Sequence, residues 1–235
     1  MWPAPQIEVL SEDALLLRFG ESIESSVNAR VHAAATRLRD QLPGVECVPA
    51  YASLLLRFDP AHWSDSEAVA PHQRLSERVL AAMRDLPDLV GSTQEVDIPV
   101  LYGGDAGPDL AAVAAHAGLS RDAVISRHSA ATYRVAMLGF APGFPYLLGL
   151  DPTLAMPRRA DPRLSVPAGS VAIGGSQTGI YPQVLPGGWQ LIGRTPLRLF
   201  DLQAPSPSLL QPGDRVRFRA IDEDEYQRLA AKVRR

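Results

Sequence analysis

The chain of 235 residues contains one lysine and one cysteine, so two kinds of reactive side chain are almost absent. The lysine, Lys232, lies close to the C-terminal end, so a phosphate-loop lysine or a Schiff-base lysine has no plausible candidate. A single cysteine, Cys47, excludes an internal disulfide. Its surroundings, Val45-Glu-Cys-Val-Pro49, are apolar, which predicts a buried residue and not a nucleophile.

Imidazole groups are also scarce where they would be most informative. All five histidines precede the glycine-rich half of the chain; they are His32, His62, His72, His116 and His128. That half is therefore expected to work without an imidazole or thiol of its own. His116 and His128 show no H-E-x-x-H pattern, so no metal site is predicted, and His116 is expected on a helix surface or near a helix end.

Neither charge nor hydrophobicity points to a nucleic acid or a membrane. The net charge is −3 and the isoelectric point is about 6.0, with basic residues spread along the chain. No apolar run approaches the length that spans a bilayer, and the first residues lack the features of a signal peptide. These absences predict a cytoplasmic protein that binds neither nucleic acid nor membrane.

Hydrophobic periodicity predicts an N-terminal domain over residues 1–92. Helical spacing occurs from Ser22 to Gln41, with Ile23, Val27 and Val31 on one face, and a second helix is expected within Glu67–Arg84, with Pro71 in its first turn. Strand patterns cover Gln6–Leu10, Ala14–Phe19, Val45–Ala50, Ser53–Phe58 and Gln94–Val100. The order β-β-α-β-β-α-β favours a small ferredoxin-like sandwich.

A turn-rich segment, Tyr102–Pro108, leads into the second domain, drawn over residues 93–235. Two short helices are expected at Pro108–Ala117, ended by Gly118, and at Arg121–Ser129, capped by Ser120. The strand candidates that follow are Tyr133–Gly139, Ser170–Gly174, Trp189–Gly193, Arg198–Leu202 and Arg215–Ile221, with a turn at 211–214 and a last helix at 222–233. This pattern predicts a β-barrel or compact sandwich, and an α+β protein as a whole.

Three blocks rich in glycine and proline alternate with aromatic and β-branched residues, as a packed structure requires. The segment Ile173–Gly179 lacks the Lys-Ser/Thr of a phosphate loop, and Thr178 replaces the second glycine of a nucleophile elbow. Two interpretations stay open. The glycines serve only the tight turns of a β-domain, or they let a ligand approach the backbone.

The second interpretation defines a set of candidate binding residues. Aromatic side chains would form an apolar wall, and polar side chains would anchor the ligand; Arg163 and Arg194 are suited to hold a carboxylate or an acyl phosphate in a bidentate manner. The complete set is Phe140, Phe144, Tyr146, Arg163, Gln177, Thr178, Tyr181, Trp189, Arg194 and Thr195.

The same blocks resemble a known family. The resemblance is carried by Ile98-Pro-Val-Leu-Tyr-Gly-Gly104, Met137-Leu-Gly-Phe-Ala-Pro-Gly-Phe-Pro-Tyr146, Val166-Pro-Ala-Gly-Ser170, Gly175-Ser-Gln-Thr-Gly-Ile-Tyr-Pro182, Pro186-Gly-Gly-Trp189 and Leu191-Ile-Gly-Arg-Thr-Pro196. These motifs are similar to the family of the bacterial 5-oxoprolinase B subunit, also called allophanate hydrolase subunit 1 or carboxyltransferase subdomain C/D. The resemblance spans nearly the whole chain.

The resemblance implies a cyclophilin-like β-barrel behind an N-terminal α/β domain. It also implies a hydrolase component that is inactive alone and works with the C and A subunits of 5-oxoprolinase, using ATP at a site shared with or supplied by a partner, to open 5-oxoproline to glutamate. Two alternatives stay open: a regulatory protein that inhibits a sensor histidine kinase, as the family member KipI does, and a carboxyltransferase component of a urea carboxylase or allophanate system.

Overall fold

The computed structural model describes residues 4–64, 69–84, 86 and 94–233 of the chain. Contacts divide the chain into two compact units, Met1–Ser92 and Thr93–Arg235. The domain boundary predicted after residue 92 lies outside the described residues. Within the described ranges, no helix is long and apolar enough to cross a membrane.

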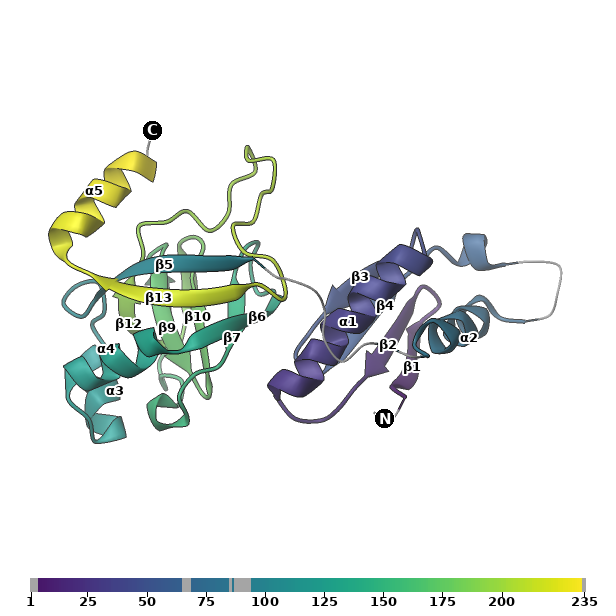
Figure 1. Cartoon of the computed structure of the whole chain (residues 1–235), viewed down its shortest axis with the longest axis horizontal. Coiled ribbons are helices and arrows are strands. Elements are labelled where there is room, and N and C mark those ends of the chain that lie inside the picture. Colours follow the sequence, from purple (N-terminus) through teal and green to yellow (C-terminus); the bar gives the residue numbers. More distant parts are fainter. Residues whose placement is uncertain (1–3, 65–68, 85, 87–93, 234–235) are drawn as a thin grey trace. The chain divides into compact units, whose positions relative to one another are not determined.

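The first unit is a four-stranded antiparallel sheet with helices packed on it (Figure 1). The strand order is β1-β2-β4-β3, and the elements are β1 (Gln6–Ser11), β2 (Ala14–Arg18), α1 (Ser25–Gln41), β3 (Glu46–Pro49), β4 (Ser53–Arg57), the 3-10 helix η1 (Pro60–Trp63) and α2 (Pro71–Ala82). Helix α1 buries Val27, Val31 and Leu38 in the core of this unit, where they meet the leucines of β2 and β4.

Three sequence predictions for this unit concern Pro71, Cys47 and the first residue of α1. Pro71 occupies the first turn of α2, as predicted. Cys47 is buried, which confirms its structural interpretation, and burial raises the pKa of its thiol. Helix α1 begins at Ser25 and not at Ser22, so Ile23 precedes the helix and is 46% exposed.

The second unit is built on a closed barrel with the strand order β10-β7-β6-β13-β5-β12-β9. Its strands are β5 (Glu95–Tyr102), β6 (Thr132–Leu138), β7 (Pro145–Leu148), β9 (Ser170–Gly174), β10 (Gln177–Ile180), β12 (Gln190–Arg194) and β13 (Arg215–Ile221). A separate two-stranded ribbon joins β8 (Arg163–Val166) to β11 (Leu185–Gly187).

Strand β5 corrects the sequence prediction. The pattern at Gln94–Val100 predicts a last strand of the N-terminal sandwich, but β5 pairs in parallel with β13 along its length, from Glu95 with Arg215 to Leu101 with Ile221. Figure 1 shows the two strands side by side. Alternating hydrophobicity identifies a half-buried strand but not its partner, which here lies about 120 residues away. The predicted α+β class with a C-terminal barrel is confirmed.

Helices α3 (Leu110–Ala117), α4 (Arg121–Ala130) and α5 (Glu223–Val233) and the 3-10 helix η2 (Pro152–Leu154) complete this unit. Gly118 ends α3 with φ of 64°, and the Ser120 hydroxyl caps α4 by accepting from the Ala123 N–H at 3.1 Å, both as predicted. Helix α3 starts at Leu110, two residues later than expected.

One predicted strand is wrong, and four were missed. Residues 198–202 form no strand; Phe200 makes only an isolated bridge to Ser208. The missed strands β7, β8, β10 and β11 have three or four residues each, and each contains or adjoins a glycine or a proline. Segments this short show too few alternations for a pattern to be recognised.

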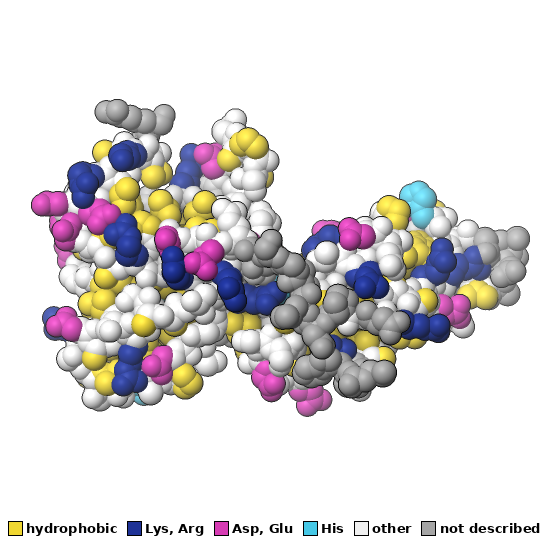
Figure 2. All heavy atoms as spheres, viewed as in Figure 1, with side chains coloured by type: hydrophobic (Ala, Val, Ile, Leu, Met, Phe, Trp, Pro, Cys, Tyr) yellow, Lys and Arg dark blue, Asp and Glu magenta, His cyan; other side chains and the backbone are white. Residues whose placement is uncertain are grey.

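The barrel wall has two differently packed faces because successive residues of a strand point to opposite sides. Val171 and Ile173 of β9 belong to the main core, whereas Ala172 between them belongs to a second cluster with Phe144, Tyr181 and Trp189. This second cluster lies on the outer face of the wall. Figure 2 shows acidic and basic side chains interspersed over the displayed face, with no large patch of one sign.

Candidate functional site

A small cavity lies at the aromatic cluster on the outer face of the barrel wall. Its volume is about 110 Å³, and it is lined by Phe140, Phe144, Tyr146, Arg158, Tyr181, Pro186, Gly187, Gly188 and Trp189. All five aromatic residues predicted as binding residues therefore line one cavity. They come from β7, from the turn before it and from the ends of β10 and β11, which the sequence separates by about forty residues.

Phe144 is the centre of the aromatic cluster. Its ring meets Tyr181 at 5.2 Å and Trp189 at 5.7 Å between centroids, both nearly perpendicular, and it meets Tyr146 at 4.9 Å. Such edge-to-face contacts are the preferred geometry of aromatic pairs. Phe144, Tyr181 and Trp189 are at most 5% exposed, so the deep walls of the cavity are held rigidly.

Glycine makes this packing possible. A Cβ atom on Gly174 would lie 2.5 Å from the Trp189 indole, and one on Gly187 would overlap the Tyr181 hydroxyl. The two interpretations of the glycine blocks therefore combine at these positions: glycine serves the packing of the β-domain, and that packing shapes a cavity.

Burial adds to the preference of both cavity phenols for the protonated form, which a phenol has at neutral pH even with its ordinary pKa of about 10. It raises the pKa of Tyr146 and of Tyr181, although the nearby Arg158 guanidinium acts in the opposite direction on both. A protonated phenol can donate a hydrogen bond to a carbonyl or carboxylate oxygen. The cavity thus offers donors and apolar faces, and its lining contains no carboxylate.

Arg158 supplies the positive charge of the cavity. Its guanidinium carbon lies 5.8 Å from the centroid of the Trp189 ring, within the range of a cation–π contact. The side chain also lines an adjoining open hollow of about 500 Å³, together with Met156, Pro157 and Arg159. Arg158 therefore stands between the aromatic cavity and this hollow.

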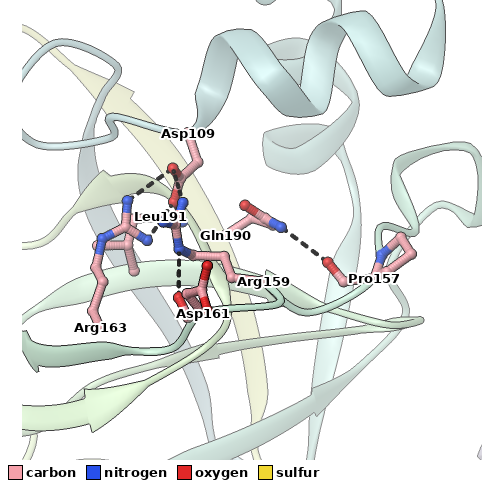
Figure 3. A network of polar contacts seen from close by, with 7 residues as sticks. All are labelled: Asp109, Pro157, Arg159, Asp161, Arg163, Gln190 and Leu191. Carbon is pink, nitrogen blue, oxygen red and sulfur yellow. Dashed lines mark hydrogen bonds and ion pairs between the residues drawn. The ribbon is translucent and has the colours of Figure 1, made fainter.

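The two neighbouring arginines are engaged by one buried carboxylate (Figure 3). Arg163 donates from Nη1 and Nη2 to the two oxygens of Asp109 at 2.9 and 2.8 Å, and Arg159 approaches the same carboxylate at 3.5 Å. Asp109 is 7% exposed and also accepts from the Leu191 N–H at 2.7 Å. This network ties the 157–163 segment and β8 to β12 and to the start of α3.

Gln177 and Thr178 do not line the aromatic cavity. Both residues belong to strand β10, from Gln177 to Ile180, which a tight turn at Gly175 joins to β9 as a hairpin. Thr178 is fully buried on the interior side of the barrel, and its hydroxyl donates to the Ala172 carbonyl at 2.9 Å.

His128 of α4, which precedes the glycine-rich half in the sequence, packs against Thr178 of that half. His128 is fully buried; its Nε2 lies 3.1 Å from Thr178 Oγ1 and its Nδ1 lies 2.8 Å from the Tyr102 hydroxyl. Because Thr178 donates its only proton to Ala172, it accepts from Nε2–H, and Nδ1 accepts from Tyr102. Burial lowers the pKa of His128 to about 3, so the imidazole is neutral. His116, in contrast, is exposed on α3, as predicted.

Arg194 and Thr195 lie at a different place. They line a broad cavity of about 700 Å³ together with residues of the 196–203 segment and of α5. Arg194 Nε donates to the Ala168 carbonyl at 2.9 Å, and Thr195 is 2% exposed. The ten predicted residues thus divide among the aromatic cavity, the Asp109 network, the hairpin β9–β10 and this second cavity. Their binding roles stay predictions.

Sequence reasoning did not select Arg158, Asp109 or His128 as site residues. Asp109 follows a proline at the start of a helix, a common position for a capping residue, and nothing in the sequence links it to arginines 50 to 54 positions later. No group of three or more possible metal ligands occurs in the part of the chain that the structure describes.

Comparisons with known proteins agree with this architecture. The family model for the carboxyltransferase domain, subdomain C and D, matches residues 5–210. The 5-oxoprolinase B subunit of Bacillus subtilis is 46% identical over 94% of this chain and 95% of its own length, and that of Escherichia coli O157:H7 is 43% identical over 89% and 93%. The crystal structure of TTHA0988 superposes with a TM-score of 0.75 at 40% identity, covering 89% of this chain and 40% of that one.

The matched domain defines the class of the protein as carboxyltransferase subdomain C and D. The chain belongs to the branch of this family formed by the 5-oxoprolinase B subunits, because the identity extends over nearly the whole of both chains. The expected family resemblance is confirmed.

Proposed function

We propose that this chain is the B subunit of an ATP-dependent 5-oxoprolinase that converts 5-oxoproline to glutamate. The observation that carries the proposal is the 46% identity over 95% of the length of the Bacillus subtilis relative. A second 5-oxoprolinase B subunit, from Escherichia coli, matches almost as completely. The aromatic cavity, which is small and bears one guanidinium, is compatible with a compact anionic substrate.

We propose further that the chain works only with partner polypeptides, the C and A subunits of the same enzyme. The relative TTHA0988 supports this, since this chain covers 40% of it and the rest of that relative is additional polypeptide. The residues that line the aromatic cavity include no imidazole, thiol, carboxylate or lysine, so general acid–base or nucleophilic groups would come from a partner. ATP would bind at a site that a partner shares or supplies.

Glutamate release tests this function directly. The purified chain is assayed with 5-oxoproline and ATP, alone and after addition of the A and C subunits. We expect ATP-dependent glutamate release only from the complete mixture. Substantial release from the isolated chain would contradict a non-autonomous role, and no release from the complete mixture would contradict the function itself and favour a regulatory or urea-carboxylase alternative.

A further inference from the structure

Arg158 differs from its two neighbouring arginines in what it binds. Arg159 and Arg163 both reach Asp109, whereas Arg158 has no carboxylate partner among the residues that the structure describes. Its guanidinium lies over the Trp189 ring at the wall of the aromatic cavity. A guanidinium that is positioned but unpaired can bind a carboxylate oxygen pair with two parallel hydrogen bonds.

The network around Asp109 explains why Arg158 is held in place. Arg159 Nε donates to the Asp161 carbonyl at 3.3 Å, and Gln190 Nε2 donates to the Pro157 carbonyl at 2.9 Å (Figure 3). The Arg159 N–H also donates to the Gly188 carbonyl. The bonds to Gly188 and Gln190 fix the backbone on both sides of Arg158 against the two neighbours of Trp189 in the chain. The segment thus fixes the backbone from which the Arg158 side chain reaches the Trp189 ring at the cavity wall.

The dimensions and chemistry of the cavity limit the ligand to a small planar anion. A volume of about 110 Å³ lies well below that of pockets for drug-sized molecules, which begin at about 300 Å³, so the aromatic cavity would not enclose a whole nucleotide. Aromatic faces favour a flat ring, and protonated phenols favour an acceptor such as a carbonyl oxygen. A carboxylate on such a ring would be attracted by the single guanidinium.

Backbone strain marks the mouth of the same cavity. Phe140 has φ of 67°, the one positive φ of a non-glycine residue in the described chain, and its side chain is 60% exposed. An aromatic residue in the left-handed region is strained and persists only where the surroundings impose it. The strained turn holds the Phe140 ring 5.4 Å from Phe144 and 6.4 Å from Tyr181, where it forms the outer wall.

We infer that the aromatic cavity is the binding site for 5-oxoproline, with Arg158 as the residue that binds its carboxylate. The lactam ring lies among the rings of Phe144, Tyr181 and Trp189, and its carbonyl accepts from a cavity phenol. Arg163, predicted from the sequence as a carboxylate-binding residue, acts instead as a positioning residue through Asp109. This inference rests on the proposed function.

Kinetics of the assembled enzyme with Arg158→Ala test the inference. We expect the KM for 5-oxoproline to rise about tenfold or more, because a hydrogen-bonded charge pair is lost, while the KM for ATP stays unchanged. Arg158→Lys keeps the charge but not the fork, so it should recover part of the loss. Arg127→Ala, which removes an exposed ion pair with Asp151 and leaves the lining of the aromatic cavity unchanged, is the matched control and should behave like the wild type.

A substrate analogue without the carboxylate separates charge recognition from damage to the cavity. 2-Pyrrolidone has the lactam ring of 5-oxoproline but no carboxylate, and it should inhibit competitively with the same Ki in the wild type and in Arg158→Ala. A parallel rise of this Ki, absence of inhibition in both, or an unchanged KM for 5-oxoproline in Arg158→Ala would each overturn the inference. If the wild-type complex is active and Arg158→Ala matches it, the proposed function stands and only this site fails.

Discussion

Polar groups on the two faces of the barrel wall differ in how completely they are paired within the chain. Inside the barrel, the buried imidazole of His128 has a partner at each nitrogen, and the Thr178 hydroxyl both donates and accepts. On the outer face, the Arg158 guanidinium contacts the face of the Trp189 ring and has no carboxylate partner among the residues that the structure describes. A polar group whose bonds are all made within the chain stabilises the fold, whereas a positioned group with unused donors is available to a ligand.

The largest predicted effect is a loss of stability in acid, caused by the buried imidazole of His128 inside the barrel. The pKa of His128 is about 3 in the folded protein and 6.5 in an unfolded chain, so between these values the unfolded state binds more protons and stability falls as the pH falls. At about 1.4 kcal/mol per pH unit, the loss from pH 6.5 to pH 3 has a ceiling of about 5 kcal/mol. Urea unfolding as a function of pH measures it.

His128→Gln is the comparison variant for this prediction, because an amide cannot titrate in this range. The variant should be less stable than the wild type at pH 7, and its stability should depend less on pH between 6.5 and 3. Equal slopes for the two proteins would mean that the imidazole does not carry the acid sensitivity.

Removal of Arg163 should have the next largest effect on stability. Arg163→Leu leaves the carboxylate of Asp109, which is 7% exposed, with only the more distant Arg159 and the Leu191 N–H. Breaking a buried pair from one side costs about 3–5 kcal/mol. Urea unfolding should show this loss, and Arg127→Ala, in an exposed pair, should cost no more than about 1 kcal/mol. A small loss of stability in Arg163→Leu would contradict a stabilising role for the Arg163–Asp109 ion pair.

The elements predicted correctly are those whose signal is local. Helices α1 and α2 follow from the spacing of apolar residues over several turns, and the Ser120 cap and Gly118 stop follow from single residues. Strand partners do not follow from local patterns, which is why the sequence prediction places β5 in the wrong sheet. Strands as short as β8 and β11 carry too little periodicity to be found.

The candidate site was predictable in its aromatic part only. Rings that recur among glycines indicate dense packing, and the five predicted aromatic residues do line one cavity. The side to which Thr178 points depends on recognising β10 as a strand. The sequence favours Arg163 over Arg158 and Arg159 as a carboxylate-binding residue. In the structure Arg163 is engaged by Asp109, 54 residues before it, and Arg158 has no carboxylate partner among the described residues.

A methyl group at Gly174 should disturb the outer face while leaving the inner face intact. The Cβ of Gly174→Ala would lie 2.5 Å from the Trp189 indole, so the ring must move, at a cost of about 1–3 kcal/mol. Gly139→Ala is the control, since its Cβ would make ordinary contacts with Tyr146 and Met137 at 3.7 and 3.9 Å. Near-ultraviolet circular dichroism and urea unfolding should change for Gly174→Ala and hardly for Gly139→Ala.

The smallest effect on stability should come from Arg158, the residue with the largest expected effect on substrate binding. Arg158→Ala removes one cation–π contact at an exposed side chain, which is worth about 0.5–1 kcal/mol. Arg163→Leu should show the opposite combination of a large stability loss with a KM that changes only through the displaced segment. Urea unfolding of the two variants, together with their KM values for 5-oxoproline, shows whether each arginine stabilises the fold or binds the substrate. A large stability loss in Arg158→Ala would place it with the residues that hold the fold, because an exposed guanidinium without a carboxylate partner has little else to contribute to folding.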